Sequence, residues 1–207
     1  MMSFKSGPPE RSPERDAAIE AMLPNVGFDG WTVATLQASA GPDADLLFPG
    51  GVRDMIEAYC DLGDRWMEDG AALLPLDDMR VPQRVRAVVA LRLEQNRPHK
   101  DAVRRALSVL ALPGNALLAA RCTGRTIDAI WRAAGDTDTP AQISYYTKRA
   151  ILAGVYGTTL LYWLQDYSED DMRTLAFLDR RLAGVGGIGA ARRRVEGLFR
   201  RLRPGMA

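Results

Sequence analysis

Apolar residues recur along this chain at intervals of three and four, the spacing that places them on one face of an α-helix. The longest such pattern runs from residue 52 to about residue 74. Its expected inward positions are Met55, Ile56, Tyr59, Leu62, Trp66 and Leu73. Further patterns follow at about 83–95, 99–112 and 115–134, with prolines ending the first two. No convincing run alternates apolar and polar residues, so the pattern predicts an all-α protein of about nine to ten helices.

Two shorter helices are expected near the N-terminus. They follow a polar, proline-rich stretch over residues 1–12 that we expect to be disordered. Ser12 and Pro13 fit the N-cap and first position of a helix that continues to about Leu23. A connection leads to a second helix over 32–40, which ends at a Gly-Pro pair.

The segment 145–165 is the most apolar part of the chain and is hydrophobic on nearly all sides. It mixes glycine and alanine with large aromatic and aliphatic residues. Such a helix is either the central core helix or a wall of an apolar cavity. A polar, acidic loop over 135–144 precedes it. After it, Ser168 and Asp171 form a variant of the capping box and predict a helix to about residue 185.

Charge is distributed unevenly, although the formal net charge is only +1. Between residues 188 and 203 six arginines stand against one glutamate, a local charge of +5. The apolar residues there share one helical face, as in a helix that lies on an anionic membrane; packing on a dimer partner is the alternative. The residues expected to contact the membrane are Ile188, Arg192, Val195, Leu198, Phe199 and Leu202.

The glycines before this stretch spell G-x-G-x-x-G (Gly184, Gly186, Gly189), as in a dinucleotide-binding loop. That loop requires a strand before it, whereas the helical pattern TLAFLDRRLAGV precedes these glycines. We therefore interpret them as a hinge between two helices.

Candidate catalytic groups are few. The single histidine, His99, lacks a carboxylate or histidine at metal-ligating spacing. Cys60 and Cys122 lie inside apolar helical patterns, and neither has an activating neighbour that the sequence identifies. The acids at 166–171 fit a helix N-terminus better than general acid–base chemistry. The sequence therefore predicts a protein that is not an enzyme and that binds no metal or cofactor.

The expected location is cytoplasmic, with peripheral association with the inner membrane. Two isolated cysteines do not form a disulfide framework, which favours a reducing compartment. No apolar run reaches the roughly 18–20 residues of a membrane-spanning helix. The first residues also lack the apolar core of a signal peptide.

The plan of two short helices, a long connecting helix and an apolar helical body resembles that of TetR-type regulators. In those regulators the second short helix of the motif enters the major groove and needs cations for the phosphates. The corresponding segment here, PDADLLF, has two acids and no lysine or arginine. The helix-turn-helix is therefore predicted to be degenerate, and no nucleic-acid partner is expected.

Several longer stretches resemble the ubiquinone (coenzyme Q) biosynthesis accessory protein family, which comprises the ninth-numbered mitochondrial coenzyme Q protein and its alphaproteobacterial relatives. The stretches are TIDAIWRAAGDTDT (126–139), YYTKRAILAGVYGTTLLYWLQDYSED (145–170), FLDRRL (177–182), GWT (30–32), LFPGG (47–51) and RRALSVLALPGN (104–115). The resemblance covers about residues 14–187 and is dense over 125–182.

This resemblance implies a TetR-like fold with a degenerate helix-turn-helix over 13–51 that no longer binds DNA. It implies a lipid-binding and dimerisation body over 52–183, and a glycine hinge with a basic amphipathic helix over 184–207. The implied protein is a homodimer that binds isoprenoid quinone intermediates and presents them to the di-iron hydroxylase acting on demethoxyubiquinone. The hydroxylase supplies the oxidative chemistry, and the chain lacks the Glu-x-x-His pairs of a di-iron enzyme.

The resemblance also implies particular site residues. The expected lipid-binding residues are Ile130, Trp131, Ile151, Leu152, Val155, Tyr156 and Leu160. The expected docking surface comprises Tyr145 and Tyr146, with Asp136 from the acidic loop. The chain departs from the family in the loop, where PAQIS (140–144) adds about two residues before the tyrosines.

Two other functions stay open at the level of sequence. The first is a TetR-type, ligand-responsive transcription regulator, which would bind DNA selectively and in a salt-dependent manner. The second is an enzyme acting on quinone intermediates, for which the sequence offers no nucleophile, metal site or cofactor loop.

Overall fold

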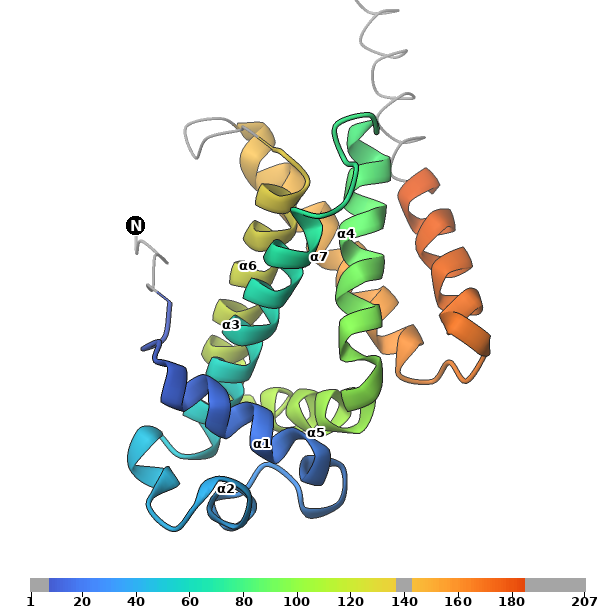
Figure 1. Cartoon of the computed structure of the whole chain (residues 1–207). Helices are drawn as coiled ribbons and strands as arrows, with labels where there is room; N and C mark the ends of the chain where they lie inside the picture. The colour runs from blue at the N-terminus through green and yellow to red at the C-terminus, as the bar shows by residue number, and fades with distance from the viewer. Residues whose placement is uncertain (1–7, 137–142, 185–207) are drawn as a thin grey trace, which may run out of the picture. The chain divides into compact units, whose positions relative to one another are not determined.

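A computed structural model describes residues 8–136 and 143–184, and all regular secondary structure within them is helical (Figure 1). The α-helices are α1 (Pro13–Asp29), α2 (Val33–Ala40), α3 (Val52–Ala71), α4 (Val81–Asn96), α5 (Lys100–Leu110), α6 (Ala116–Ala133) and α7 (Ile143–Trp163). Residues 172–184 are also helical. Short 3-10 turns are η1 (Ala44–Leu47), η2 (Arg97–His99), η3 (Pro113–Asn115) and η4 (Glu169–Asp171). The chain forms two compact units, Met1–Ala153 and Gly154–Ala207, which are described separately below.

The prediction of an all-α fold is confirmed, but the number of helices differs slightly from the expected nine to ten. The described residues contain the seven labelled α-helices and the helix over 172–184. The short segments that separate longer helices are single 3-10 turns, too short to count as further α-helices. The predicted terminal helix lies outside the described residues.

Helix α1 begins as predicted but ends six residues later than expected, at Asp29 instead of Leu23. The Ser12 hydroxyl accepts a hydrogen bond from the Arg15 amide, which caps the first turn. Pro24 lies inside the helix on its exposed side and removes only one backbone hydrogen bond. Continuing the helix buries Val26 completely, and Gly30 then ends it in a left-handed conformation (φ 82°).

The segment that would be a recognition helix in a TetR-type regulator is the four-residue turn η1. The Gln37 side chain of α2 donates to the Asp45 carboxylate (2.9 Å) and to the Pro42 carbonyl (3.0 Å), which fixes this turn against α2. The Arg15 guanidinium lies over the buried Phe48 ring, 4.4 Å from its centroid. These contacts hold residues 13–48 together, although this part of the chain has no second full helix after α2.

The core of the first unit lies between α3, α4 and α6, and α3 and α6 run side by side in Figure 1. Its most buried side chains, each at most 2% exposed, include Met55, Ile56, Val88, Val89, Leu93, Leu118 and Ile130. One of the predicted inward positions of α3, Leu73, was wrong. Trp66 is half-buried, and Leu73 is 86% exposed because α3 ends at Ala71, before that residue.

A buried polar cluster joins the same three helices. Asp64 of α3 accepts hydrogen bonds from the Thr126 hydroxyl of α6 (2.9 Å) and pairs with Arg92 of α4 (3.1 Å). Gly63 permits this arrangement, since a Cβ atom there would lie 2.1 Å from Nη1 of Arg92. Burial raises the pKa of Asp64 to about 6, against the opposing effects of Arg92 and Thr126.

In the second unit, Asp166 organises the start of the helix over 172–184. Its carboxylate accepts hydrogen bonds from the Thr174 amide (2.8 Å), the Thr174 hydroxyl (2.6 Å) and the Ser168 amide (2.9 Å). Burial opposes ionisation of this carboxylate, but these hydrogen bonds outweigh it and lower its pKa. Asp166 therefore supplies the main cap, where the sequence had suggested a Ser168–Asp171 capping box.

No single helix among the described residues is long and apolar enough to cross a membrane. Among the described residues, the helical segments Val81–Leu110 and Pro113–Ala133 are long and apolar enough when taken together. They are bent by 96° relative to each other.

Candidate functional site

A cavity of about 950 Å³ lies between α6 and the first turns of α7, within the first unit. Its volume is within the range of small-molecule sites. The walls carry small side chains, and a Cβ atom on Gly124 would have no neighbour within 4 Å. The lining residues are Ala119, Ala120, Arg121, Thr123, Gly124, Arg125, Ile127, Asp128, Tyr145, Tyr146, Arg149, Ala150 and Ala153.

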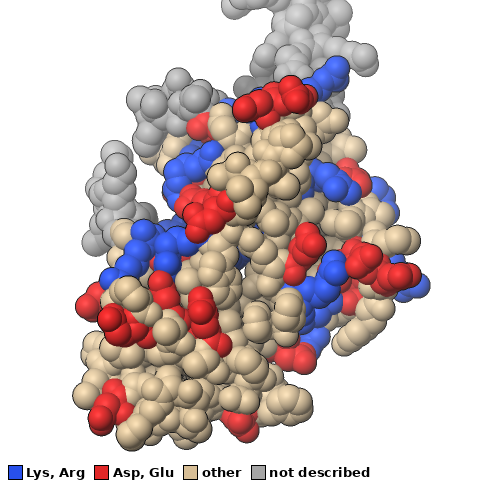
Figure 2. Space-filling view, viewed as in Figure 1, with Lys and Arg blue, Asp and Glu red and all other residues tan. Residues whose placement is uncertain are grey.

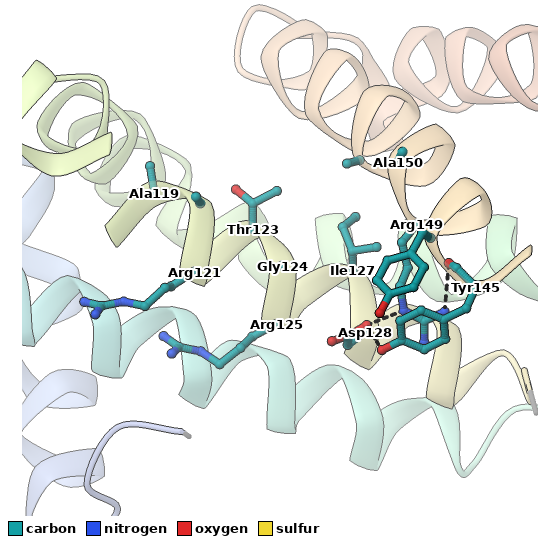
Figure 3. A pocket seen from close by; sticks show the side chains of 13 residues that line it. Ala119, Arg121, Thr123, Gly124, Arg125, Ile127, Asp128, Tyr145, Arg149 and Ala150 are labelled. Atoms are coloured by element: carbon teal, nitrogen blue, oxygen red, sulfur yellow. Dashed lines mark hydrogen bonds and ion pairs between the residues drawn. The ribbon is translucent and has the colours of Figure 1, made fainter. Parts of the chain in front are cut away.

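Three polar side chains meet at one end of the cavity: Asp128 of α6 and Tyr145 and Arg149 of α7 (Figure 3). The Arg149 guanidinium donates to the Asp128 carboxylate and lies 3.3 Å from the centroid of the Tyr145 ring. The Tyr145 hydroxyl is 3.5 Å from the Asp128 carboxylate, at the upper limit of a hydrogen bond. This hydroxyl is therefore weakly held and can donate to another acceptor in the cavity.

The start of α7 is attached to the end of α6 through Asp136. Its carboxylate pairs with Lys148 (2.8 Å) and with Arg149 (3.5 Å), and its side chain is 5% exposed. The Lys148 ammonium also lies over the Trp131 ring, 5.6 Å from the centroid. Asp136 was predicted to belong to a docking surface; that role stays a prediction, and in the structure its carboxylate holds the start of α7 through these two ion pairs.

Tyr145 and Tyr146, the other predicted docking residues, lie together at the cavity. Their rings meet edge to face, with centroids 5.1 Å apart. The Tyr146 side chain is 62% exposed, so it offers aromatic surface next to the cavity opening. Docking by these tyrosines stays a prediction.

Two of the lining arginines connect α6 to α3. Arg125 pairs with Glu57 (2.7 Å), and Arg121 approaches the same carboxylate (3.5 Å). In Figure 3 both guanidinium groups point away from Ala150, whereas Ala119, Thr123 and Ile127 face α7. The charged ends of these arginines therefore strengthen the α3–α6 contact, and the α7 side of the cavity is mainly apolar.

The residues predicted to bind lipid do not line this cavity. In the first unit Ile130, Trp131 and Leu152 are buried, and Ile151 is 40% exposed. In the second unit Val155 and Tyr156 are buried and Leu160 is half-buried. The residues expected to bind lipid are large and apolar. The small residues that leave the cavity empty were not predicted. Ala120 and Gly124, one turn apart on α6, were the available signal.

The predicted membrane contacts, Ile188, Arg192, Val195, Leu198, Phe199 and Leu202, lie outside the described residues, as do Gly186 and Gly189 of the hinge. Within residues 8–136 and 143–184, no group of three or more His, Cys, Asp or Glu side chains is placed to hold a metal ion. His99 is half-buried, and burial lowers its pKa.

The amino-acid sequence of the chain is similar to those of known proteins. The COQ9 family model matches residues 116–189. The mitochondrial ubiquinone biosynthesis protein COQ9 of Rattus norvegicus is 36% identical over 117 residues, which cover 56% of this chain and 37% of that protein. The human protein of the same name is 33% identical over 135 residues (64% and 42%). That of Eremothecium gossypii is 29% identical over 194 residues (86% and 76%). The chain thus spans well under half the length of the two mammalian proteins that it matches.

A solved structure supports the fold independently. The TetR transcriptional regulator from Nitrosomonas europaea superposes with a TM-score of 0.67 over 83% of this chain and 97% of that one, at 20% sequence identity. An identity this low is informative about the fold alone. The chain is therefore similar to COQ9 proteins, with the family model matching residues 116–189, and it has a TetR-like fold.

Proposed function

We propose that this protein is a non-catalytic accessory factor of ubiquinone biosynthesis that binds isoprenoid quinone intermediates and presents them to a partner hydroxylase. One observation carries the proposal: the family match over residues 116–189 includes both walls of the α6–α7 cavity. The relatives matched are named as ubiquinone biosynthesis proteins. We assign the binding of the intermediate to this cavity.

The chemistry of the walls fits an amphiphile with a polar ring and an apolar tail. The tail would lie along Ala120, Gly124, Ala150 and Ala153, where the small side chains leave room for a branched hydrocarbon chain. Each methylene transferred from water to an apolar wall contributes about 0.8 kcal/mol. The ring would lie at the other end, where the weakly held Tyr145 hydroxyl can donate to a quinone carbonyl.

A cavity-filling variant tests this assignment. Gly124→Leu places a side chain in open space, so it should fold normally and weaken binding of a short-tailed ubiquinone analogue at least about tenfold. Gly124→Ala is the matched control, because it adds one methyl group at the same position and should bind with nearly unchanged affinity. Equilibrium dialysis measures both. Equal affinity of wild type and Gly124→Leu for the analogue would show that the analogue does not bind in this cavity.

Presentation requires a partner and a membrane surface. The exposed Tyr146 beside the cavity opening is the proposed contact for the demethoxyubiquinone hydroxylase-type enzyme. A homodimer would carry two such surfaces.

The basic segment 188–203 is the proposed contact for anionic lipid. Deleting residues 188–207 should leave the far-ultraviolet circular dichroism helical and abolish sedimentation with anionic liposomes. Unchanged sedimentation would contradict the membrane assignment.

The TetR-like fold makes DNA binding the second candidate, but charge argues against it. Residues 16–52 contain five acids (Asp16, Glu20, Asp29, Asp43, Asp45) and no lysine, arginine or histidine. Figure 2 shows the end of the molecule formed by α1 and α2 mainly in tan with scattered red. Each phosphate contact needs a cation, so this end opposes binding to DNA. A salt-sensitive, sequence-selective mobility shift at nanomolar protein would favour the regulator instead.

A further inference from the structure

The corner at which α5 leads into α6 presents an uncharged, apolar surface. It comprises residues 106–120, ALSVLALPGNALLAA, which we call the apolar corner. Leu112 and Leu117 are each 56% exposed, and the residues between them, apart from Asn115, are exposed as well. A continuous apolar surface of this kind is typical of a site that contacts lipid or another protein.

The two polar side chains of the apolar corner are bonded to the backbone of α5. Asn115 is buried, and its amide donates a hydrogen bond to the Val109 carbonyl (2.8 Å). The Ser108 hydroxyl donates to the Arg104 carbonyl (3.0 Å). Because these groups have partners inside the protein, moving the corner from water into an apolar medium leaves neither of them unpaired.

Arginines flank the apolar corner, and few acids oppose them. Residues 102–127 include no lysine, aspartate or glutamate but four arginines: Arg104, Arg105, Arg121 and Arg125. Arg53 of α3 adds a fifth and donates to the Gly114 carbonyl within the corner (3.5 Å). Three of the five pair with Asp101 or Glu57. Among the described residues no carboxylate is paired with Arg53 or Arg105, so the corner has excess positive charge beside it.

The hydropathy of the flanking helices also points to lipid. Val81–Leu110 and Pro113–Ala133, which among the described residues are together long and apolar enough to cross a membrane, meet at this corner with a bend of 96°. Both segments contribute side chains to the core of the first unit. Contact of the corner alone with a lipid surface therefore fits the structure better than a span across the bilayer.

We propose that the apolar corner is a membrane-contact surface, which inserts Leu112 and Leu117 between the headgroups of an anionic bilayer. The flanking arginines then lie near the lipid phosphates. Protein interfaces carry about one hydrogen bond per 100–200 Å². Both polar side chains of the corner are already bonded to its own backbone, so lipid fits this surface better than a protein partner does. One weak membrane signal gives only reversible binding, and the corner supplies a second signal in addition to the basic segment 188–203.

The apolar corner also leads into the cavity between α6 and α7. Ala119 and Ala120 of the cavity wall follow Leu117 within one helical turn. Membrane contact would place this end of the cavity against lipid, where an isoprenoid tail can enter without crossing water. This consequence rests on the proposed function, whereas the membrane contact itself does not.

A pair of double variants of the full-length protein tests the apolar contact. Leu112→Ser/Leu117→Ser removes two exposed apolar side chains without adding charge. Sedimentation with vesicles of phosphatidylcholine and phosphatidylglycerol should show a partition coefficient at least about tenfold lower than that of the wild type. The control is Leu73→Ser/Val81→Ser, which changes two other exposed side chains at the connection between α3 and α4, at the opposite end of α3 from Arg53. It should partition like the wild type, and an equal effect of the two double variants would overturn the proposal.

Amide hydrogen exchange tests the contact without any substitution. Bound vesicles should slow exchange of the wild-type protein within residues 111–117. Unchanged exchange there in protein that sediments with the vesicles would overturn the proposal.

A matched pair of arginine variants tests the charge. Arg53→Gln should lower the partition coefficient about fivefold, because a cation near an anionic membrane contributes about 1 kcal/mol. Arg80→Gln removes an exposed arginine at the connection between α3 and α4 and should have little effect. Equal effects of the two substitutions would contradict the assignment of Arg53.

The membrane contact and the quinone site can fail separately. Gly124→Leu should lose the short-tailed ubiquinone analogue in dialysis and still partition onto vesicles like the wild type. Leu112→Ser/Leu117→Ser should show the reverse pattern. Loss of vesicle binding in Gly124→Leu would overturn the corner as an independent membrane contact, whereas failure of every variant to bind the analogue would contradict only the quinone site.

Discussion

At the scale of single residues, two glycines on neighbouring helices have opposite surroundings. Gly63 of α3 lies against the buried Arg92 guanidinium, and a Cβ atom there would be only 2.1 Å from Nη1. Gly124 of α6 faces the open cavity, where a Cβ atom meets nothing within 4 Å. The first glycine is needed for packing, and the second keeps space free. Their responses to the same substitution should therefore differ in sign.

Gly63→Ala should lower the free energy of unfolding by about 1–3 kcal/mol, because the new methyl group displaces Arg92 from Asp64. Gly124→Ala should raise the free energy of unfolding by about 0.5–1 kcal/mol, because alanine restricts the unfolded chain and favours a helix. Urea denaturation of both variants measures the two changes. Destabilisation of equal size in both would contradict the packing described here.

The raised pKa of Asp64 should make the free energy of unfolding depend on pH. Its pKa is about 6 in the folded chain and near 4 when unfolded, so the folded protein binds the additional proton between these values. The contribution of Asp64 to stability is therefore full below about pH 4 and falls as the pH rises through 6, by about 1.4 kcal/mol per unit of pKa difference.

Asp64→Asn should remove this particular fall, because the amide keeps a neutral hydrogen-bonding group at all pH values. Thermal denaturation of both proteins between pH 4 and 7 measures the difference. If the wild type becomes more stable relative to Asp64→Asn as the pH rises through this interval, then the buried carboxylate is ionised throughout and the account of its pKa is wrong.

At the scale of helices, the helix over 172–184 depends on one buried cap. Asp166→Ala removes three acceptor contacts, from the Thr174 amide and hydroxyl and from the Ser168 amide. The loss should destabilise this unit by about 1–2 kcal/mol and speed amide exchange over 172–184. Since these contacts lower the pKa of Asp166, the stabilisation is present above about pH 4 and is lost on acidification. Exposed Glu169 provides the control, and Glu169→Ala should leave exchange unchanged.

Helix ends were predicted well where local signals such as capping residues set them. They were predicted less well where burial of an apolar side chain sets the end. Ser12 and Pro13 fixed the start of α1 because capping is a local interaction. Pro24 misled the prediction of its end, because complete burial of Val26 compensates for one lost hydrogen bond. The contact between Cys122 and Arg125 follows from their spacing of three on one helix and could have been predicted.

At the scale of the whole chain, family and fold could be predicted from the sequence, whereas the position of the cavity could not. Long motifs between residues 126 and 182 indicated the similarity to this family, and the COQ9 family model matches residues 116–189. A cavity depends on where side chains are small on two facing helices, and these helices are separate segments of the sequence. A family resemblance does not report where small side chains face each other, so large residues such as Ile130 were expected to bind lipid, although Ile130 is buried in the core.

We propose above that an isoprenoid quinone occupies the space between α6 and α7. The most direct measurement is photo-crosslinking of the purified protein with a ubiquinone analogue that carries a photoreactive group in its tail, followed by peptide mass spectrometry. We expect labelling within residues 119–128 and 145–153, competition by unlabelled ubiquinone, and loss of the label in Gly124→Leu. Labelling confined to other segments, or labelling that Gly124→Leu leaves intact, would contradict it.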